Sequence, residues 1–210
     1  MMKLLVFGAT GGTGKQIVAQ ALEQGHVVTA FARNPAAVTT KHENLKVVQG
    51  DVLDYPSVEA AVAGQDAVLS ALGARSLGRT TLLSEGTQNI IRATKRHGVR
   101  RFVCESSLGV GDSKGQLGWL FDFVVLPLVL RNIYRDKEVQ EQHIKQSDLD
   151  WIIVRPAALT NGPRTGVYRT EFKRTGGSFI PKISRADVAD FMLKQLSDNT
   201  YLRMTPGQWY

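Results

Sequence analysis

Short apolar runs alternate along the chain with longer segments in which apolar residues recur at helical spacing. Residues 3–7 are almost entirely apolar, and in the segment after them Ile17, Val18, Ala21 and Leu22 share one helical face. Continuous apolar runs are typical of parallel strands that are buried on both faces. The pattern therefore predicts an α/β fold, a doubly wound parallel sheet in one domain over residues 1–210. The other strands are predicted at residues 26–31, 45–49, within 64–73, and at 101–105 and 150–155.

Helices are predicted where a capping residue precedes a periodic segment. The predicted caps are Ser57, beside Pro56, then Thr80 or Thr81, before a long helix that ends near residues 97–98, and Ser184, before the last helix. A charged helix is predicted over residues 134–147, a turn at 175–177 and a short strand at 178–180. With the strands, these helices complete the alternation of a doubly wound fold.

The composition is that of a soluble globular protein. With 43% hydrophobic and 21% charged residues, global disorder is excluded. The net charge of +7 could attract polyanions, but much of the excess lies at residues 92–101, around a helix end where cations complement the helix dipole. No nucleic-acid motif accompanies it, so we expect no nucleic-acid partner. The oligomeric state stays open, with a monomer favoured.

The single cysteine, Cys104, lies in an apolar run, so no disulfide can form within the chain. The N-terminus enters the first strand at once, which leaves no room for a signal peptide. Both features predict a cytoplasmic protein. No metal site is expected, because the four histidines are scattered without ligand spacing; they are His26, His42, His97 and His143.

Residues 117–130 form the most apolar stretch of the chain. The stretch is too short to cross a bilayer, and it contains Asp122 and Pro127. We therefore expect no stable membrane insertion. A lid, a subunit interface and a membrane-surface contact remain open for it.

The strongest functional signal is the glycine-rich sequence of residues 8–14, between the first strand and the first helix. A tight turn there brings backbone N–H groups against a pyrophosphate at the positive end of the helix, with no Cβ in the way. Its G-x-x-G-x-x-G spacing differs from the general G-x-G-x-x-G fingerprint. The loop predicts a dinucleotide site, with hydroxyl donors among its residues. The predicted contacts are Gly8, Thr10, Gly11, Gly12, Thr13 and Gly14.

Arg33 follows the second strand, where the residue type distinguishes the two nicotinamide dinucleotides. An acid there accepts a hydrogen bond from the ribose 2′-OH of NAD(H), whereas an arginine accommodates the 2′-phosphate of NADP(H). No acid is present, so the sequence predicts NADP(H) as the cofactor. Asp51 and Val52, after the third strand, could flank the adenine; a simple turn aspartate is the alternative interpretation of Asp51.

Together these segments resemble the atypical short-chain dehydrogenase/reductase family, and most closely its biliverdin IXβ reductase/flavin reductase branch. The resemblance covers nearly the whole chain and rests on residues 6–11, 50–53, 62–68, 72–73, 80–81, 84–86 and 97–99. It implies pyrophosphate contacts for the glycine loop, a 2′-phosphate contact for Arg33, adenine contacts for Asp51 and Val52, and contacts near the nicotinamide ribose for Leu72, Gly73 and Arg75. It also implies that Ser107 lies beside the nicotinamide and the acceptor, and that Pro156 opens the loop below the ring. Ala157 and Ala158 stand where the human-type branch carries a histidine, so the acceptor pocket is expected to be shaped differently.

Ser106 and Ser107 come at the carboxyl end of the fifth strand, the edge at which ligands bind in open α/β sheets. The usual Tyr-x-x-x-Lys pair of short-chain dehydrogenases is absent, because Tyr134 is followed by Lys137 three residues later and by Glu138 four residues later. Alcohol–ketone interconversion is therefore disfavoured. The two serines are the candidate catalytic residues, which would donate to the acceptor or fix the carboxamide; hydroxyls that satisfy the backbone at a strand end are the alternative.

These features predict an NADPH-dependent reductase that transfers hydride to a planar, delocalised acceptor, a flavin or a linear tetrapyrrole such as biliverdin. Such acceptors take a proton from water, so the protein has mainly to orient the two reactants. The acceptor pocket is expected in the loops after strands four, five and six. A non-catalytic NADP(H)-binding redox sensor of the nitrogen-regulator-like type is the alternative. A third possibility is an assembly or membrane-associated factor that uses residues 117–130.

Overall fold

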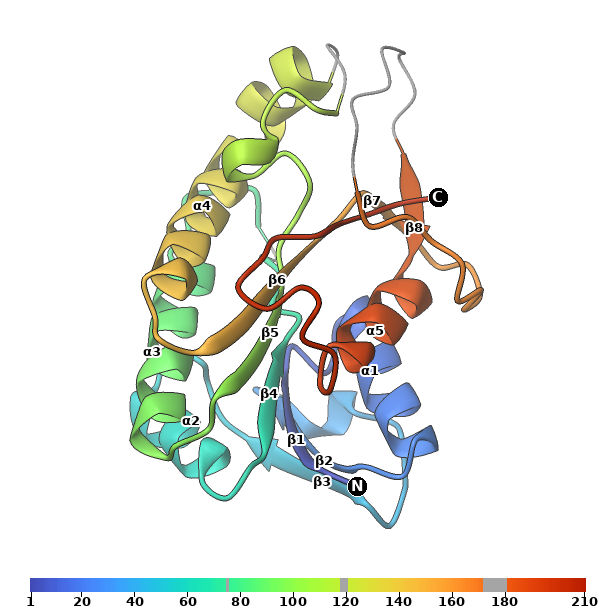
Figure 1. Cartoon of the computed structure of the whole chain (residues 1–210). Helices are drawn as coiled ribbons and strands as arrows, with labels where there is room; N and C mark the ends of the chain where they lie inside the picture. Colours follow the sequence, from blue (N-terminus) through green and yellow to red (C-terminus); the bar gives the residue numbers. More distant parts are fainter. Residues whose placement is uncertain (75, 118–120, 172–180) are drawn as a thin grey trace.

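The computed structural model of the chain describes residues 1–74, 76–117, 121–171 and 181–210. Across these residues a seven-stranded parallel sheet forms the centre, in the order β3-β2-β1-β4-β5-β6-β9 (Figure 1). The order reverses between β1 and β4, which makes this point the switch of a doubly wound fold. The predicted fold class is confirmed. The strands are β1 Lys3–Phe7, β2 Val27–Ala32, β3 Leu45–Gln49, β4 Ala67–Ser70, β5 Arg101–Glu105, β6 Asp150–Pro156 and β9 Gly207–Gln208.

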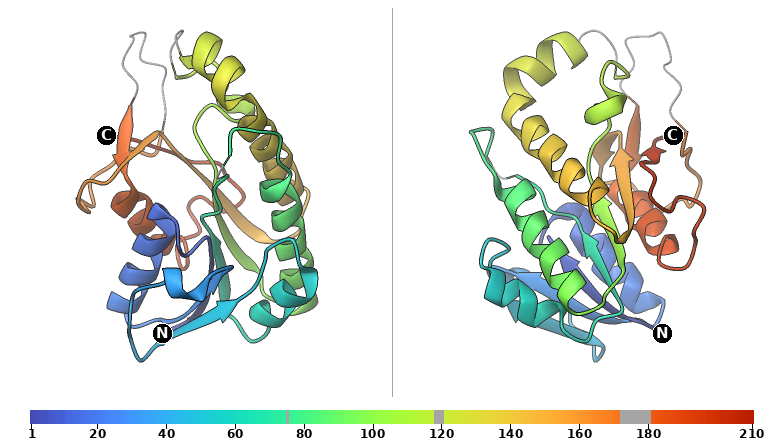
Figure 2. Two further views of the ribbon diagram at one scale, coloured as in Figure 1. Left: turned by 180° about the vertical axis from the view of Figure 1, so that it is seen from behind. Right: turned by 60° about the vertical axis from the view of Figure 1, so that its left-hand side comes forward.

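Helices cover both faces of the sheet (Figures 1 and 2). Helices α1 (Gly12–Glu23) and α5 (Arg185–Lys194) pack on one face, and α2 (Tyr55–Val62), α3 (Leu82–Arg96) and α4 (Arg131–Lys145) pack on the other. Because the strands run parallel, all their carboxyl ends meet at one edge, which is the edge where the glycine loop lies.

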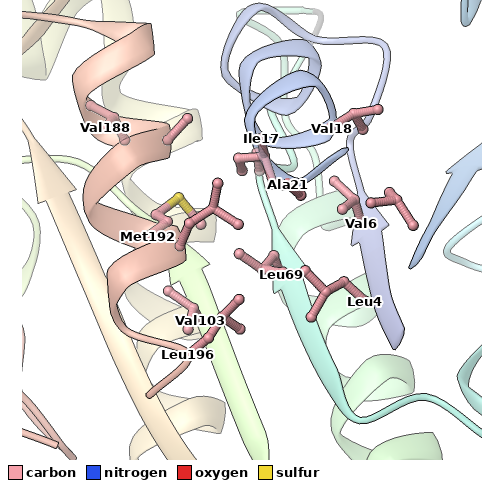
Figure 3. Close-up of a cluster of buried hydrophobic side chains, with 14 of the residues drawn as sticks. Leu4, Val6, Ile17, Val18, Ala21, Leu69, Val103, Val188, Met192 and Leu196 are labelled. Atoms are coloured by element: carbon pink, nitrogen blue, oxygen red, sulfur yellow. The ribbon is translucent and has the colours of Figure 1, made fainter. Parts of the chain in front are cut away.

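A separate hydrophobic core fills each face. Between the sheet and helices α1 and α5, the side chains of Ile17, Leu69 and Met192 are fully buried and point toward one another (Figure 3). On the other face Phe102 and Ile153 lie in a second cluster with residues of α2, α3 and α4. Burying one such side chain stabilises the fold by about 1.5–3 kcal/mol. Since both sheet faces are covered, the central strands carry no polar face, and this made them recognisable in the sequence.

One helix cap agrees with the cap predicted from the sequence, and two differ from it. The Ser184 hydroxyl accepts a hydrogen bond from the backbone N–H of Asp187, as predicted for the start of α5. Helix α2 is capped by Asp54, whose carboxylate accepts from the N–H of Ser57, so Ser57 itself is not the cap. The two donors at the start of α3, the N–H groups of residues 83 and 84, are satisfied by the carboxylate of Asp136 from α4.

Thr80 and Thr81 were the predicted caps of α3, and both are displaced from that role by Asp136. Thr81 occupies the N-cap position without a side-chain cap, and the Thr80 hydroxyl accepts from the N–H of Leu82. A cap supplied from another helix leaves no local signal, because the capping pattern that sequences show requires the acceptor within the same turn. The start of α3 is therefore a tertiary contact.

Several element boundaries also differ from the prediction. Strand β2 begins and ends one residue later, and α4 begins at Arg131 because the π-helical segment η3 (Phe121–Leu130) leads directly into it. Strand β6 extends one residue beyond the prediction, to Pro156, whose carbonyl accepts from the N–H of Leu108 at 2.9 Å. The predicted turn at residues 175–177 and strand at 178–180 lie outside the described residues.

Short elements were missed altogether. Strands β7 (Ala158–Thr160) and β8 (Lys182–Ser184) form a second small parallel sheet, and 3₁₀ turns occur at Pro35–Ala37 and Gly111–Ser113. Strand β9 is only two residues long and pairs with the end of β6. Segments of two or three residues carry too little periodicity to be read from sequence.

In the described part of the apolar stretch, η3 lies beyond the carboxyl edge of the sheet and leads into α4 (Figure 1). Within it Leu128 is 77% exposed and Val129 is 47% exposed. No helix in the described ranges has both the length and the apolar character that crossing a bilayer would require.

Candidate functional site

The glycine loop has the predicted strand–turn–helix setting, between β1 and α1. Gly8 has φ +76°, and an ideal Cβ at this position would lie 2.3 Å from the carbonyl oxygen of Ala71, in the loop after β4. A Cβ on Gly14 would lie 2.0 Å from the carbonyl oxygen of Gly8 itself. Glycine is therefore required at both positions, because the loop packs directly against α1 and the end of β4.

A cleft of about 480 Å³ opens beside this loop, at the switch point of the sheet. It is lined by eight of the residues that the sequence predicted for the cofactor: Gly8, Thr10, Gly11, Gly12, Arg33, Val52, Leu72 and Gly73. Further lining comes from Phe31, Ala32, Asn34, Ala37, Gly50, Ala74, Leu82 and Arg185. The described lining thus includes two arginines and no acid, which suits a ligand that carries phosphates.

Arg33 stands at the rim of the cleft, directly after β2. Its side chain is exposed, and among the described residues its guanidinium has neither an ion-pair nor a hydrogen-bond partner. An arginine that is not used within the fold retains all five of its N–H donors for a ligand. Its location agrees with the predicted contact to a 2′-phosphate.

Four predicted cofactor residues do not line the cleft. Thr13 is buried and its hydroxyl donates to the carboxylate of Glu105 at 3.0 Å, so the hydroxyl is not directed at a phosphate. Asp51 accepts from the N–H of Leu53 within a local turn, which is the alternative interpretation of this residue. The other two are Gly14 and Pro156, which are buried. Arg75 lies outside the described residues.

Arg185 is a cleft residue that the sequence did not reveal. It is the first residue of α5, yet its side chain reaches the glycine loop, where an ideal Cβ on Gly12 would lie 2.5 Å from its Cδ atom. The guanidinium Nη1 donates to Oδ1 of Asn161 at 2.7 Å. In a sequence, an arginine in the first turn of a capped helix looks like an ordinary surface residue. No local signal could therefore have identified Arg185 as a cleft residue.

The end of β5 brings together a serine and a tyrosine from different elements. The Ser107 hydroxyl oxygen is 3.1 Å from the Tyr134 hydroxyl oxygen, and Tyr134 donates to the carbonyl of Leu108 at 3.0 Å. Lys137, one turn further along α4, donates from Nζ to the carbonyl of Ser106 at 3.0 Å. Residues three apart on a helix lie on the same face.

Tyr134 therefore lies next to Ser107, a contact that no local pattern predicted. The sequence lacks Tyr-x-x-x-Lys, but a Tyr-x-x-Lys spacing also directs both side chains of α4 toward the carboxyl end of β5. Searching for a tyrosine and lysine on one helix face, instead of for the four-residue spacing alone, would have found Tyr134.

Ser106 does not have the position expected of a catalytic residue. It is only 4% exposed, and its hydroxyl donates to Oε1 of Glu141 at 2.7 Å. Glu141 is also buried and holds Arg155 through two hydrogen bonds, of 3.0 and 2.6 Å. Ser106 is therefore part of a buried polar cluster that anchors the loop after β5, and neither Ser106 nor Ser107 is among the described residues that line the cleft.

Two ionisable side chains adjoin this site, the buried Glu105 and the half-buried Lys137. Burial raises the pKa of Glu105, while the charges of Lys137 and Arg185 and the hydrogen bond from Thr13 act against that rise. Burial lowers the pKa of Lys137, and the negative charge of Glu105 opposes the change. The two groups therefore stabilise each other's charged form at the carboxyl end of β5.

Cys104 takes no part in this chemistry. The thiol is fully buried, and burial raises its pKa to about 12, so it remains protonated near neutral pH. Within the described ranges, no group of three or more His, Cys, Asp or Glu side chains is close enough to hold a metal ion. The expected absence of a metal stays a prediction.

Comparison with known proteins points to the same class of ligand, a nicotinamide dinucleotide. A family model described as NAD(P)H-binding matches residues 8–199. An uncharacterized chloroplastic protein of Arabidopsis thaliana is 35% identical over 204 residues, which are 92% of this chain and 71% of that protein. A photosystem II assembly factor of Synechocystis is 30% identical over 165 residues, 77% of this chain and 46% of the factor. The chain thus spans less than half of the assembly factor.

Solved structures show the same fold. A putative exported protein of Burkholderia pseudomallei has a TM-score of 0.82 at 29% identity, with both chains fully covered. An anaerobilin reductase of Escherichia coli O157:H7 has a TM-score of 0.81 at 24% identity, covering 99% of this chain and 96% of its own. A Veillonella parvula short-chain dehydrogenase/reductase in complex with NADP has a TM-score of 0.80 at 18% identity, covering 100% and 94%. The last two likenesses show the fold alone.

Proposed function

Because the chain belongs to the NAD(P)H-binding family of proteins like the atypical short-chain dehydrogenases/reductases, we propose that it is an NADPH-dependent reductase of a planar, delocalised acceptor. The acceptor would be a flavin or a linear tetrapyrrole. The observation that carries the proposal is the pair of hydroxyls on Ser107 and Tyr134, 3.1 Å apart, at the carboxyl end of β5. Strand β5 lies next to β4, whose following loop lines the cleft.

The surroundings of the hydroxyl pair are apolar. Leu108, Leu117 and Ala157 form a buried cluster between the loops after β5 and β6, and the half-buried Leu126 of η3 packs against it. A planar conjugated acceptor would reach this cluster only at Leu126, with the hydroxyls fixing its polar edge. A linear tetrapyrrole is proposed as an acceptor for two reasons: the sequence resemblance, and the fold that the chain shares with an anaerobilin reductase.

The reaction would need little acid catalysis from the chain. A bound NADPH supplies a hydride, and the acceptor completes its reduction by taking a proton from water or from a nearby hydroxyl. The residues of the chain would orient the reactants: Lys137 holds the Ser106 carbonyl, so the backbone that carries Ser107 is fixed relative to α4. Orientation of this kind can supply a large part of a rate enhancement.

Replacing Arg33 with alanine is expected to weaken NADPH binding about ten- to a hundredfold and to leave NADH binding nearly unchanged. Only NADPH carries the 2′-phosphate, and a charge-assisted hydrogen bond contributes about 1.5–3 kcal/mol. Fluorescence titration with both cofactors measures the difference. The control is Lys41→Ala, which removes an exposed charge outside the cleft lining. Equal losses for both cofactors would refute the role of Arg33.

Turnover tests the reductase assignment. Purified protein with NADPH is expected to reduce FMN, FAD, riboflavin or a biliverdin isomer, and Ser107→Ala should lower kcat roughly five- to tenfold, the effect of about one hydrogen bond, with NADPH affinity unchanged. Tyr134→Phe, which removes the neighbouring hydroxyl, measures whether the pair acts together. The control is Ser147→Ala, since that hydroxyl bonds the Ile144 carbonyl at the far end of α4. An unchanged kcat in both site variants would remove the hydroxyl pair from the mechanism.

A non-catalytic NADP(H)-binding regulator is the second candidate. It is favoured by the likeness to a photosystem II assembly factor, and by Leu128 and Val129 of η3, whose exposed side chains could contact a partner. Tight NADPH binding without turnover of any flavin or tetrapyrrole would support this alternative. The cytoplasmic location and the monomeric state stay predictions.

A further inference from the structure

We propose that Arg185 is a second phosphate-binding arginine, which holds the pyrophosphate of the dinucleotide together with the glycine loop. The proposal rests on the cofactor part of the proposed function and is independent of the acceptor. It gives the C-terminal part of the chain a direct contact with the cofactor, because Arg185 belongs to α5 while the loop belongs to β1 and α1.

The first argument is the path of the side chain. An ideal Cβ on Gly12 would lie 2.5 Å from Cδ and 2.6 Å from Nε of Arg185, so the stem of the arginine passes directly over this glycine. Gly12 is the first residue of α1 and lies in the cleft lining, as Arg185 does. The guanidinium is therefore held near the positive end of α1, where backbone N–H groups favour an anion.

The second argument is that the guanidinium is fixed but largely unused. Its Nη1 donates to Oδ1 of Asn161 at 2.7 Å, which is its one hydrogen bond within the described ranges. An arginine has five N–H donors, so most remain for phosphate oxygens. Arg185 is only partly exposed, and it starts a helix whose cap is secured by Ser184. A guanidinium held in this way loses little conformational freedom when it binds a phosphate.

The third argument is charge. Two like charges, those of Arg33 and Arg185, line one cleft in which no described lining residue is acidic. Glu105 is the acid whose pKa responds to Arg185, although burial has the larger effect on it. Two unpaired arginines that share a cleft repel each other weakly, and a ligand with negative groups at two separate points relieves that repulsion.

Loss of Arg33 and loss of Arg185 should change cofactor binding in different ways. Arg33 follows β2, where a 2′-phosphate is expected, and this group occurs only in NADP(H). Arg185 lies over the start of α1, where a pyrophosphate is expected, and this group occurs in both NADP(H) and NAD(H). Loss of Arg33 should therefore change cofactor preference, and loss of Arg185 should change affinity without changing preference.

Arg185→Met tests the proposal, because methionine keeps an apolar stem over Gly12 and removes the guanidinium. We expect the affinities for NADPH, NADH and ADP-ribose each to fall about ten- to a hundredfold, by similar factors, in fluorescence or calorimetric titrations. ADP-ribose contains the pyrophosphate but neither nicotinamide nor 2′-phosphate, so Arg33→Ala should leave its affinity unchanged. The matched control is Lys182→Met, which removes an exposed charge on β8 outside the cleft lining.

Two further variants keep the test decisive if Arg185→Met does not fold, as judged by circular dichroism. Arg185→Lys keeps the charge without the planar fork and should give an intermediate loss, and Asn161→Ala, which releases the guanidinium, should weaken all three ligands a few-fold. Affinities within twofold of the Lys182→Met control in these variants would overturn the proposal. A loss confined to NADPH would also overturn it, because Arg185 would then contact the 2′-phosphate. Absence of acceptor turnover would count against the reductase assignment alone.

Discussion

Gly8→Ala is expected to reduce NADPH affinity by at least about a hundredfold. Gly8 has φ +76°, and the new Cβ would lie 2.3 Å from the Ala71 carbonyl oxygen and 2.6 Å from its carbonyl carbon. Both neighbours are backbone atoms, so the glycine loop or the end of β4 must move. The backbone N–H groups would then no longer converge on the pyrophosphate, and losing two such charge-assisted bonds costs about 3–6 kcal/mol.

Gly25 provides a closely matched control for this prediction. It has the same φ of +76°, but a Cβ there would meet nothing within 4 Å. Gly25→Ala should therefore carry only the cost of the left-handed backbone conformation, about 1–2 kcal/mol in the free energy of unfolding, and should bind NADPH normally. NADPH titration and urea denaturation of both variants separate the two effects. If the variants lost affinity to the same extent, strain would explain the loss and the close approach to Ala71 would not.

Glu141→Met is expected to lower the free energy of unfolding by about 3–5 kcal/mol. The substitution leaves Arg155, which is 2% exposed, without the carboxylate that accepts two of its hydrogen bonds. Removing one partner of a buried ion pair is the costly case, and the remaining partner, Asp112 at 2.8 Å from Nη2 of Arg155, is 73% exposed and compensates the buried charge only in part. The loop after β5 would also lose the bond from Ser106 to Glu141, so reductase turnover should fall as well.

Two comparisons make the second prediction specific. The double variant Glu141→Met with Arg155→Met removes both buried charges and should recover much of the lost stability, because the partners left behind, such as Asp112, are exposed to water. Asp148→Ala breaks an ion pair with Lys95 whose side chains are 68% and 48% exposed, and it should cost no more than about 1 kcal/mol. Urea denaturation measures all three. Equal losses for Glu141→Met and Asp148→Ala would show that the buried pair contributes no more than a surface pair.

The sequence determined the parts of this protein that depend on neighbouring residues. The apolar run of residues 3–7 matches β1 because a central strand buried on both faces needs a continuous apolar segment. Residues 45–49 match β3, an edge strand that is only partly buried. Ser184 was recognisable as a cap because it lies within hydrogen-bonding reach of the same helical turn. The glycine loop was recognisable for a similar reason, since its spacing within seven residues reflects a local turn.

The tertiary structure alone decided which distant residues share a site. Asp136 caps α3 from another helix, Tyr134 joins Ser107 across 27 positions of sequence, and Arg185 reaches the loop that contains Gly12. Each contact forms because parallel strands bring their carboxyl ends to one edge and helices pack over it, which no local pattern encodes. Ser106 and Ser107 show the limit most directly: they are adjacent in sequence, yet one is buried against Glu141 and the other meets Tyr134, because successive side chains of an extended segment point in opposite directions.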